Sequence, residues 1–179
     1  MRSTLYGGLG FIMMWTGLSA ADKAPITAQA QRGREIFLHS TKGTACGTCH
    51  QMADVGTAIG PDLSMMAGMA TVHSMVATIR MTMTNTILSV KTANGAFPAV
   101  LKQKNGDVSE FWDLSQTPPV SRKLTAKEIV SSDRDTKWPH PPSTNDYTKQ
   151  EFADLIGFLR WAANGSQKEV QVSEIGELQ

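Results

Sequence analysis

The sequence predicts a mainly α fold with a small β insertion. Apolar residues recur at helical spacing in residues 148–165. Earlier in the chain, turn signals at residues 94–95 and 104–107 separate runs that are rich in β-branched and aromatic residues. With 179 residues, 41% of them hydrophobic, the chain can form one sizeable domain around a packed core.

Charge and cysteine content exclude several classes of protein. The formal net charge is only +1, and no basic stripe is long enough to follow a phosphate backbone, so nucleic acid is not an expected partner. Two cysteines cannot form the framework of a small disulfide-rich protein.

Residues 1–21 have the features of a signal peptide. A short start containing Arg2 precedes an apolar run over residues 9–15, and small residues follow at 19–21. Cleavage after Ala20 or Ala21 would export the mature chain, in bacteria to the periplasm. An uncleaved membrane anchor is the alternative, although the apolar run is short for a membrane span.

In residues 31–37, Gly33 and Phe37 are four positions apart, a spacing that in a helix places both residues on one face. His39 closes this helix before the polar turn at residues 40–43, where a cation near the helix C-terminus is favourable.

The next segment, Cys46-Gly47-Thr48-Cys49-His50, is the C-x-x-C-H pattern of covalent haem attachment. On a tight turn, two thiols at this spacing reach the two vinyl groups on one edge of a porphyrin. The adjacent imidazole can then fold under the ring to the iron. This interpretation makes Cys46 and Cys49 covalent anchors of one haem c and His50 its proximal iron ligand.

Three other interpretations of the two thiols fit the sequence less well. A thioredoxin-like pair would need a helix running on from the motif, yet residues 53–60 are glycine-rich and irregular. A zinc site would need a second ligand pair, and a disulfide between Cys46 and Cys49 would close a very small loop.

A methionine-rich segment follows the motif, and beyond it lies the β insertion. Thr71 is expected to cap a helix that runs through Met75 to Met83, with most of the thioethers packed in the interior. The insertion spans residues 87–130, with strands expected at 87–91, 97–103, 108–114 and 120–124.

The last helix has the clearest sequence signal. Thr148 and Glu151 form a capping box, apolar residues then repeat at helical spacing, and Asn164-Gly165 ends the run. The domain is therefore expected to span residues 22–165. The polar segment 166–179 is expected to be a mobile tail.

Together these segments resemble the class I cytochrome c family at both ends of the mature chain. Residues 31–37 are similar to the family's first helix, residues 59–63 to its G-P-x-L loop, and residues 153–159 to its last helix. The resemblance implies a helical fold around one haem, with the first and last helices crossing closely. It also implies that the Pro61 carbonyl accepts a hydrogen bond from the His50 imidazole.

In that family a Met before the last helix usually binds the sixth position of the iron. Here the corresponding segment, residues 136–142, contains no Met, and His140 takes that place between two prolines. Trp138 could cover an edge of the porphyrin. Two alternatives remain: a thioether from Met65, Met66 or Met69, or an open sixth position.

The sequence thus predicts an exported mono-haem protein that carries single electrons between redox proteins, and no catalytic residues. Its donor and acceptor are not specified. The alternatives are a haem subunit fixed in a larger dehydrogenase or respiratory complex, including one associated with a membrane, and a peroxidase-like haem enzyme with an open distal site.

Overall fold

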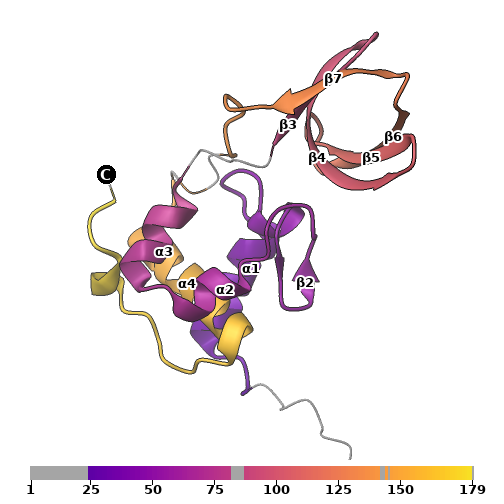
Figure 1. Ribbon diagram of the computed structural model, residues 1–179. Helices are drawn as coiled ribbons and strands as arrows, with labels where there is room; N and C mark the ends of the chain where they lie inside the picture. Colours follow the sequence, from indigo (N-terminus) through magenta and orange to yellow (C-terminus); the bar gives the residue numbers. More distant parts are fainter. Residues whose placement is uncertain (1–23, 82–86, 142–143, 145, 179) are drawn as a thin grey trace, which may run out of the picture.

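The protein has a mixed α/β architecture. The computed structural model describes residues 24–81, 87–141, 144 and 146–178, and shows a helical part and a separate antiparallel sheet (Figure 1). Of the described residues, 33% are in helices and 26% are in strands, so the prediction of a mainly α fold is wrong. The expected small hairpin or sheet is a five-stranded sheet, which makes strand almost as abundant as helix. The predicted signal peptide, residues 1–21, lies outside the described residues.

The helical part is built from both ends of the chain. Its described residues form four α-helices, two short 3₁₀ helices and a two-stranded ribbon. These are α1 (Ala28–His39), η1 (Cys46–Thr48), β1 (Gln51–Met52), β2 (Val55–Gly56), α2 (Ser64–Met69), α3 (Val72–Ile79), α4 (Lys149–Asn164) and η2 (Val172–Ile175).

Threonine hydroxyls begin three of these helices. Thr27, Thr71 and Thr148 each accept a hydrogen bond from a backbone N–H in the first turn of α1, α3 and α4. The capping box predicted at Thr148 and Glu151 is confirmed. Gly165 ends α4 with a φ of 72°, a left-handed conformation that favours glycine. Helix α3 ends at Ile79, and Met83 lies outside the described residues.

Helices α1 and α4 pack closely at Gly33. A Cβ atom at Gly33 would overlap the backbone carbonyl of Asp154 and lie 2.8 Å from the Cβ of Phe158. Beside this crossing, the rings of Phe37 and Phe158 lie 5.3 Å apart between centroids. The absence of a side chain at Gly33 therefore allows the two ends of the chain to meet.

The five-stranded sheet occupies the middle of the chain. Its strands are β3 (Leu88–Thr92), β4 (Gly95–Asn105), β5 (Val108–Asp113), β6 (Val120–Thr125) and β7 (Ile129–Arg134). All neighbours are antiparallel, in the order β6-β5-β4-β3-β7. The sequence predicted the first four strands approximately, but not β7, which pairs with β3 and brings the end of the insertion back to its beginning.

The sheet curls around a small apolar core of its own. Val90, Phe97, Ala99 and Phe111 are buried together on its inner face. The guanidinium of Arg122 lies 4.2 Å from the centre of the Phe97 ring and pairs with the buried carboxylate of Asp113 at 2.7 Å. Register shifts in β3 and β4 accompany this curvature, which is visible in Figure 1.

The C-terminal segment packs on the helices, where the sequence predicted a mobile tail. The side-chain amide of Gln29 accepts from the Val170 N–H and donates to the Val170 carbonyl, both at 2.8 Å. Val170 and Ile175 are buried. These two apolar contacts and the paired hydrogen bonds hold the segment in place.

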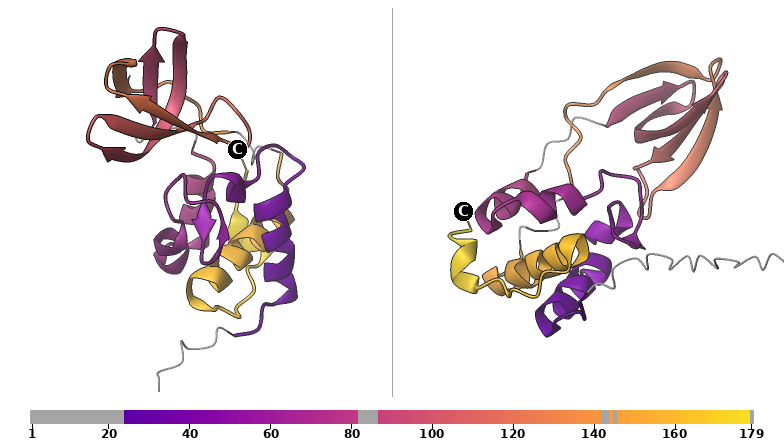
Figure 2. Two further views of the ribbon diagram at one scale, coloured as in Figure 1. Left: turned by 90° about the vertical axis from the view of Figure 1, so that its right-hand side faces the viewer. Right: turned by 60° about the horizontal axis from the view of Figure 1, so that its bottom comes forward.

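The sheet projects from the helical part, as the three views in Figures 1 and 2 show. The chain enters the sheet after α3 and leaves it after β7. Within the described residues, no helix is long and apolar enough to cross a membrane.

Candidate cofactor site

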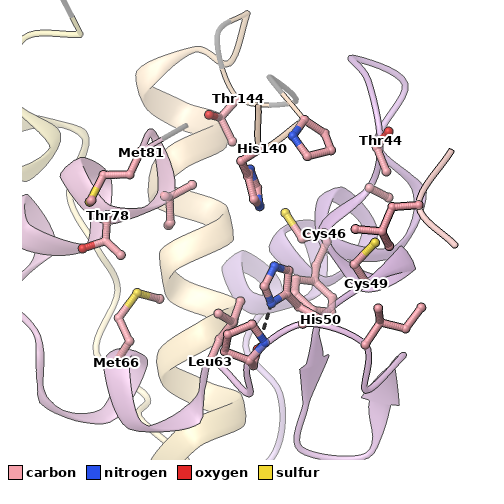
Figure 3. A pocket seen from close by; sticks show the side chains of 18 of the residues that line it. Thr44, Cys46, Cys49, His50, Leu63, Met66, Thr78, Met81, His140 and Thr144 are labelled. Atoms are coloured by element: carbon pink, nitrogen blue, oxygen red, sulfur yellow. Dashed lines mark hydrogen bonds between the residues drawn. The ribbon is translucent and has the colours of Figure 1, made fainter. Parts of the chain in front are cut away.

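A largely apolar pocket of about 330 Å³ lies between the helices and the base of the sheet. Figure 3 shows it lined by the turn that contains both cysteines, by residues of α2 and α3, and by the segment after β7. Its volume falls in the range of about 300–1,000 Å³ that is usual for small-molecule and cofactor sites.

The C-x-x-C-H segment forms a tight turn at one wall of this pocket. The carbonyl of Cys46 accepts hydrogen bonds from the N–H of Cys49 at 3.2 Å and of His50 at 2.8 Å. Gly47 is pressed against α1, where a Cβ atom would lie 2.8 Å from the Leu38 side chain. This turn places Cys46, Cys49 and His50 together on the lining of the pocket.

The loop after the motif fixes the orientation of the His50 ring. Its Nδ1 lies 2.8 Å from the carbonyl oxygen of Pro61. Because a carbonyl can only accept, Nδ1 carries the proton and Nε2 keeps a free lone pair. Gly60 passes so close that a Cβ there would lie 2.7 Å from Cε1 of the ring. The contact predicted for Pro61 is therefore present in the structure.

A second imidazole faces His50 across the pocket. The ring centroids of His50 and His140 are 5.9 Å apart, and the ring planes differ by 39°. Burial, and then the neighbouring His50, lower the pKa of His140 below its usual value. This shift favours the neutral imidazole of His140, which is the form that binds metals. Trp138 also lines the pocket.

Of the three methionines considered as alternative ligands, only Met66 lines the pocket. Met65 is 77% exposed and Met69 is 84% exposed, and neither lines the pocket. Met81, which the sequence analysis did not consider as a ligand, lies on the pocket wall together with Thr78 (Figure 3).

The pocket also has walls that sequence reasoning missed. Ile87, Val100 and Leu114 come from the sheet and its edges. Their hydrophobicity was visible in the sequence, but their position depends on how the sheet docks, and no local signal carries that information. Leu155 and Leu159 of α4 also line the pocket. These two belong to the helical repeat that predicted α4.

Both thiols are in an environment that disfavours the thiolate. Burial raises the pKa of Cys46 to about 11 and also raises the pKa of Cys49. Catalytic thiols of dithiol oxidoreductases have lowered pKa values instead. The pocket therefore holds these cysteines as protonated thiols beside an apolar cavity.

The arrangement fits a haem. Two imidazoles that bind one metal ion from opposite sides, each at a metal–nitrogen distance of about 2 Å, have centroids roughly 6 Å apart. The observed 5.9 Å matches this separation, and His50 turns its free nitrogen away from Pro61. The apolar walls suit the faces of a porphyrin, and both thiols lie at one side of the cavity (Figure 3).

Comparisons with known proteins do not support the expected family. No protein-family model matches the chain, and no curated protein is similar enough to count as a relative. The identification as a class I cytochrome c is wrong, because the chain is a mixed α/β protein with a five-stranded antiparallel sheet rather than a helical one. Among the residues that the structure describes, no group of three or more His, Cys, Asp or Glu side chains could together hold a metal ion.

Proposed function

We propose that this chain is an exported electron-transfer protein that carries one covalently bound haem c in the pocket. Cys46 and Cys49 form the two thioether links, while His50 and His140 bind the iron from opposite faces. The single observation that carries the proposal is the pair of imidazoles facing each other across an apolar cavity beside two thiols.

Two protein ligands are enough for this iron. The porphyrin supplies four of the six ligands, so the chain must add only one on each face. A bare metal ion would need three or four side chains from the protein. The facing pair formed by His50 and His140 therefore suits a haem better than a bare ion.

The surrounding residues favour a site that changes little between oxidation states. The Pro61 carbonyl holds the His50 ring in one orientation and one tautomer, which raises its basicity as a ligand. Apolar side chains such as Ile59, Leu155 and Leu159 line the cavity. When bound, the haem supplies a centre that gains and loses one electron.

The geometry favours electron transfer over catalysis at the iron. An imidazole on each face leaves no position for a substrate, whereas a peroxidase-like enzyme needs one open face. Dithiol redox chemistry is also disfavoured, because burial raises the pKa of both thiols. We therefore assign the protein a carrier function between redox proteins, with no catalytic residues.

Spectroscopy of the mature, coloured protein tests this function. Low-temperature electron paramagnetic resonance and near-infrared magnetic circular dichroism should show a low-spin ferric iron with two imidazole ligands. A redox titration should be reversible with one electron, at a lower potential than with a thioether ligand. Spectra typical of a thioether ligand would instead identify Met66 or Met81 as the distal iron ligand. Rapid carbon monoxide binding by the reduced protein would indicate an open site and favour an enzyme.

A further inference from the structure

The segment that carries His140 leaves the sheet directly at the pocket. Arg134 at the end of β7 pairs with Leu88 at the start of β3. The N–H of Asp135 then donates to the carbonyl of Ile87 at 2.8 Å. Ile87 is 5% exposed and lines the pocket. Asp135 is therefore the residue at which the chain passes from the sheet to the wall of the pocket.

The side chain of Asp135 fixes the turn that follows. Its Oδ1 accepts hydrogen bonds from the backbone N–H of Lys137 and of Trp138, both at 2.9 Å. An aspartate that accepts from the amides two and three residues further on stabilises a tight turn. After this turn, Trp138 and His140 both lie on the pocket lining.

Few free backbone rotations remain between this turn and the imidazole. Pro139 fixes its own φ, and Pro141 restricts His140 to extended conformations. The position of the His140 ring therefore depends mainly on the direction of the backbone after the turn at Asp135.

We propose that Asp135 is the positioning residue for the distal ligand and that the sheet, through it, holds His140 opposite His50. This inference rests on the proposed function, because it assumes that His140 binds iron. Without the carboxylate, the amides of Lys137 and Trp138 lose their acceptor and the segment can leave its turn. The imidazole would then spend part of its time away from the iron.

The test compares three variants of the full chain, matured with haem attached. Asp135→Ala removes the acceptor, Asp135→Asn keeps an acceptor oxygen, and Asp133→Ala removes an exposed carboxylate from β7 as a control. The readouts are the high-spin fraction of the ferric protein and the rate at which the ferrous protein binds carbon monoxide. Circular dichroism verifies that each variant keeps its fold.

Asp135→Ala should produce a high-spin fraction and raise the rate of carbon monoxide binding about tenfold or more. The binding rate depends on the fraction of molecules whose iron has a free sixth position, and the substitution should increase this fraction. Asp135→Asn and Asp133→Ala should both resemble the wild type. If Asp135→Ala also resembles the wild type while His140→Ala becomes high-spin, the positioning role is refuted and the proposed function stands. If His140→Ala stays low-spin, His140 is not the distal ligand, which refutes both the positioning role of Asp135 and the proposed ligation by His50 and His140.

Hydrogen exchange of the wild-type protein is a test that does not depend on whether any variant folds. The amides of Lys137 and Trp138 should exchange at least tenfold more slowly than in an unstructured chain of the same sequence, because Asp135 binds them. Exchange at the unstructured rate would show that the turn is not held and would overturn the inference.

Discussion

The imidazole rings of His50 and His140 face each other at a centroid distance of 5.9 Å, although they come from different parts of the fold. His50 follows η1 in the helical part, and His140 follows the last strand of the sheet. The pair therefore forms only when the sheet and the helices have both folded and docked. This dependence makes the site sensitive to substitutions in either part.

Replacement of His140 by alanine should convert the ferric iron from low spin to high spin, because one axial ligand is lost. The proposed thioether links to Cys46 and Cys49 do not involve His140, so the haem should stay attached. Electron paramagnetic resonance measures the change. His73→Ala is the matched control, because His73 lies exposed on α3, and it should leave the spectrum unchanged. A low-spin spectrum in His140→Ala would assign the distal position to another residue.

Gly60→Ala should disturb the proximal ligand. The added Cβ would lie 2.7 Å from Cε1 of His50, so the ring must turn and its hydrogen bond to Pro61 must lengthen or break. We expect a measurable high-spin fraction in the optical spectrum. Gly68→Ala is the control, because its Cβ would meet its nearest atom at 3.9 Å. Identical spectra for both variants and the wild type would contradict the assigned role of the Gly60 contact.

Gly33→Ala should destabilise the whole helical part. The Cβ would collide with the backbone of Asp154, which cannot move without shifting α4. Overpacking of this kind lowers the unfolding free energy by about 1–3 kcal/mol. We expect a loss at the upper end of this range, because the Cβ would overlap backbone atoms. Denaturant unfolding should show a lower midpoint at an unchanged slope. Gly68→Ala should leave the midpoint unchanged or raise it, because alanine is favoured in a helix.

Acid should weaken the sheet through Glu110. Hydrogen bonds from Lys102 first, and then from Ser121 and Gln103, lower the pKa of Glu110 to about 2. In the unfolded chain the pKa of a glutamate is about 4.3, so the folded sheet favours the ionised form. This contribution to stability is complete above the unfolded pKa and is lost as the pH falls from about 4.3 towards 2.

The Glu110→Gln variant measures that contribution. Its unfolding free energy should lie below that of the wild type at pH 6, and the difference should shrink as the pH approaches 2. Denaturant titrations over this range test it, with Glu35→Gln as the control because Glu35 is exposed on α1. A difference that stays constant from pH 6 to pH 2 would show that the hydrogen bonds do not favour ionised Glu110.

Local sequence signals predicted the parts of the molecule that depend on neighbours in the chain. The capping box of α4 needs only Thr148 and Glu151, which are three residues apart, and it is present. The tight turn at Cys46 to His50 likewise follows from its own backbone hydrogen bonds. The close approach of α1 and α4 was expected from the family resemblance rather than from a local signal, and Gly33, which has no side chain, permits it.

Local sequence signals could not predict the fold class or the part of the pocket wall that comes from the sheet. The expectation of a helical protein came from resemblance at the two ends, while the middle of the chain forms a five-stranded sheet. The pairing of β7 with β3 and the docking of Val100 against the pocket depend on residues distant in sequence. The burial of Val170 depends on hydrogen bonds to Gln29, near the opposite end of the chain. The polar sequence of residues 166–179 gives no local sign of this contact.

The mass of the mature protein under denaturing conditions tests the central claim most directly. Unfolding releases a cofactor that is held only by coordination, but thioether bonds to Cys46 and Cys49 survive it. We predict a mass that exceeds the polypeptide by one haem, reduced to the bare polypeptide when both cysteines are replaced by alanine. A colourless wild-type protein with the mass of the polypeptide alone, after expression with a cytochrome c maturation system, would contradict the account.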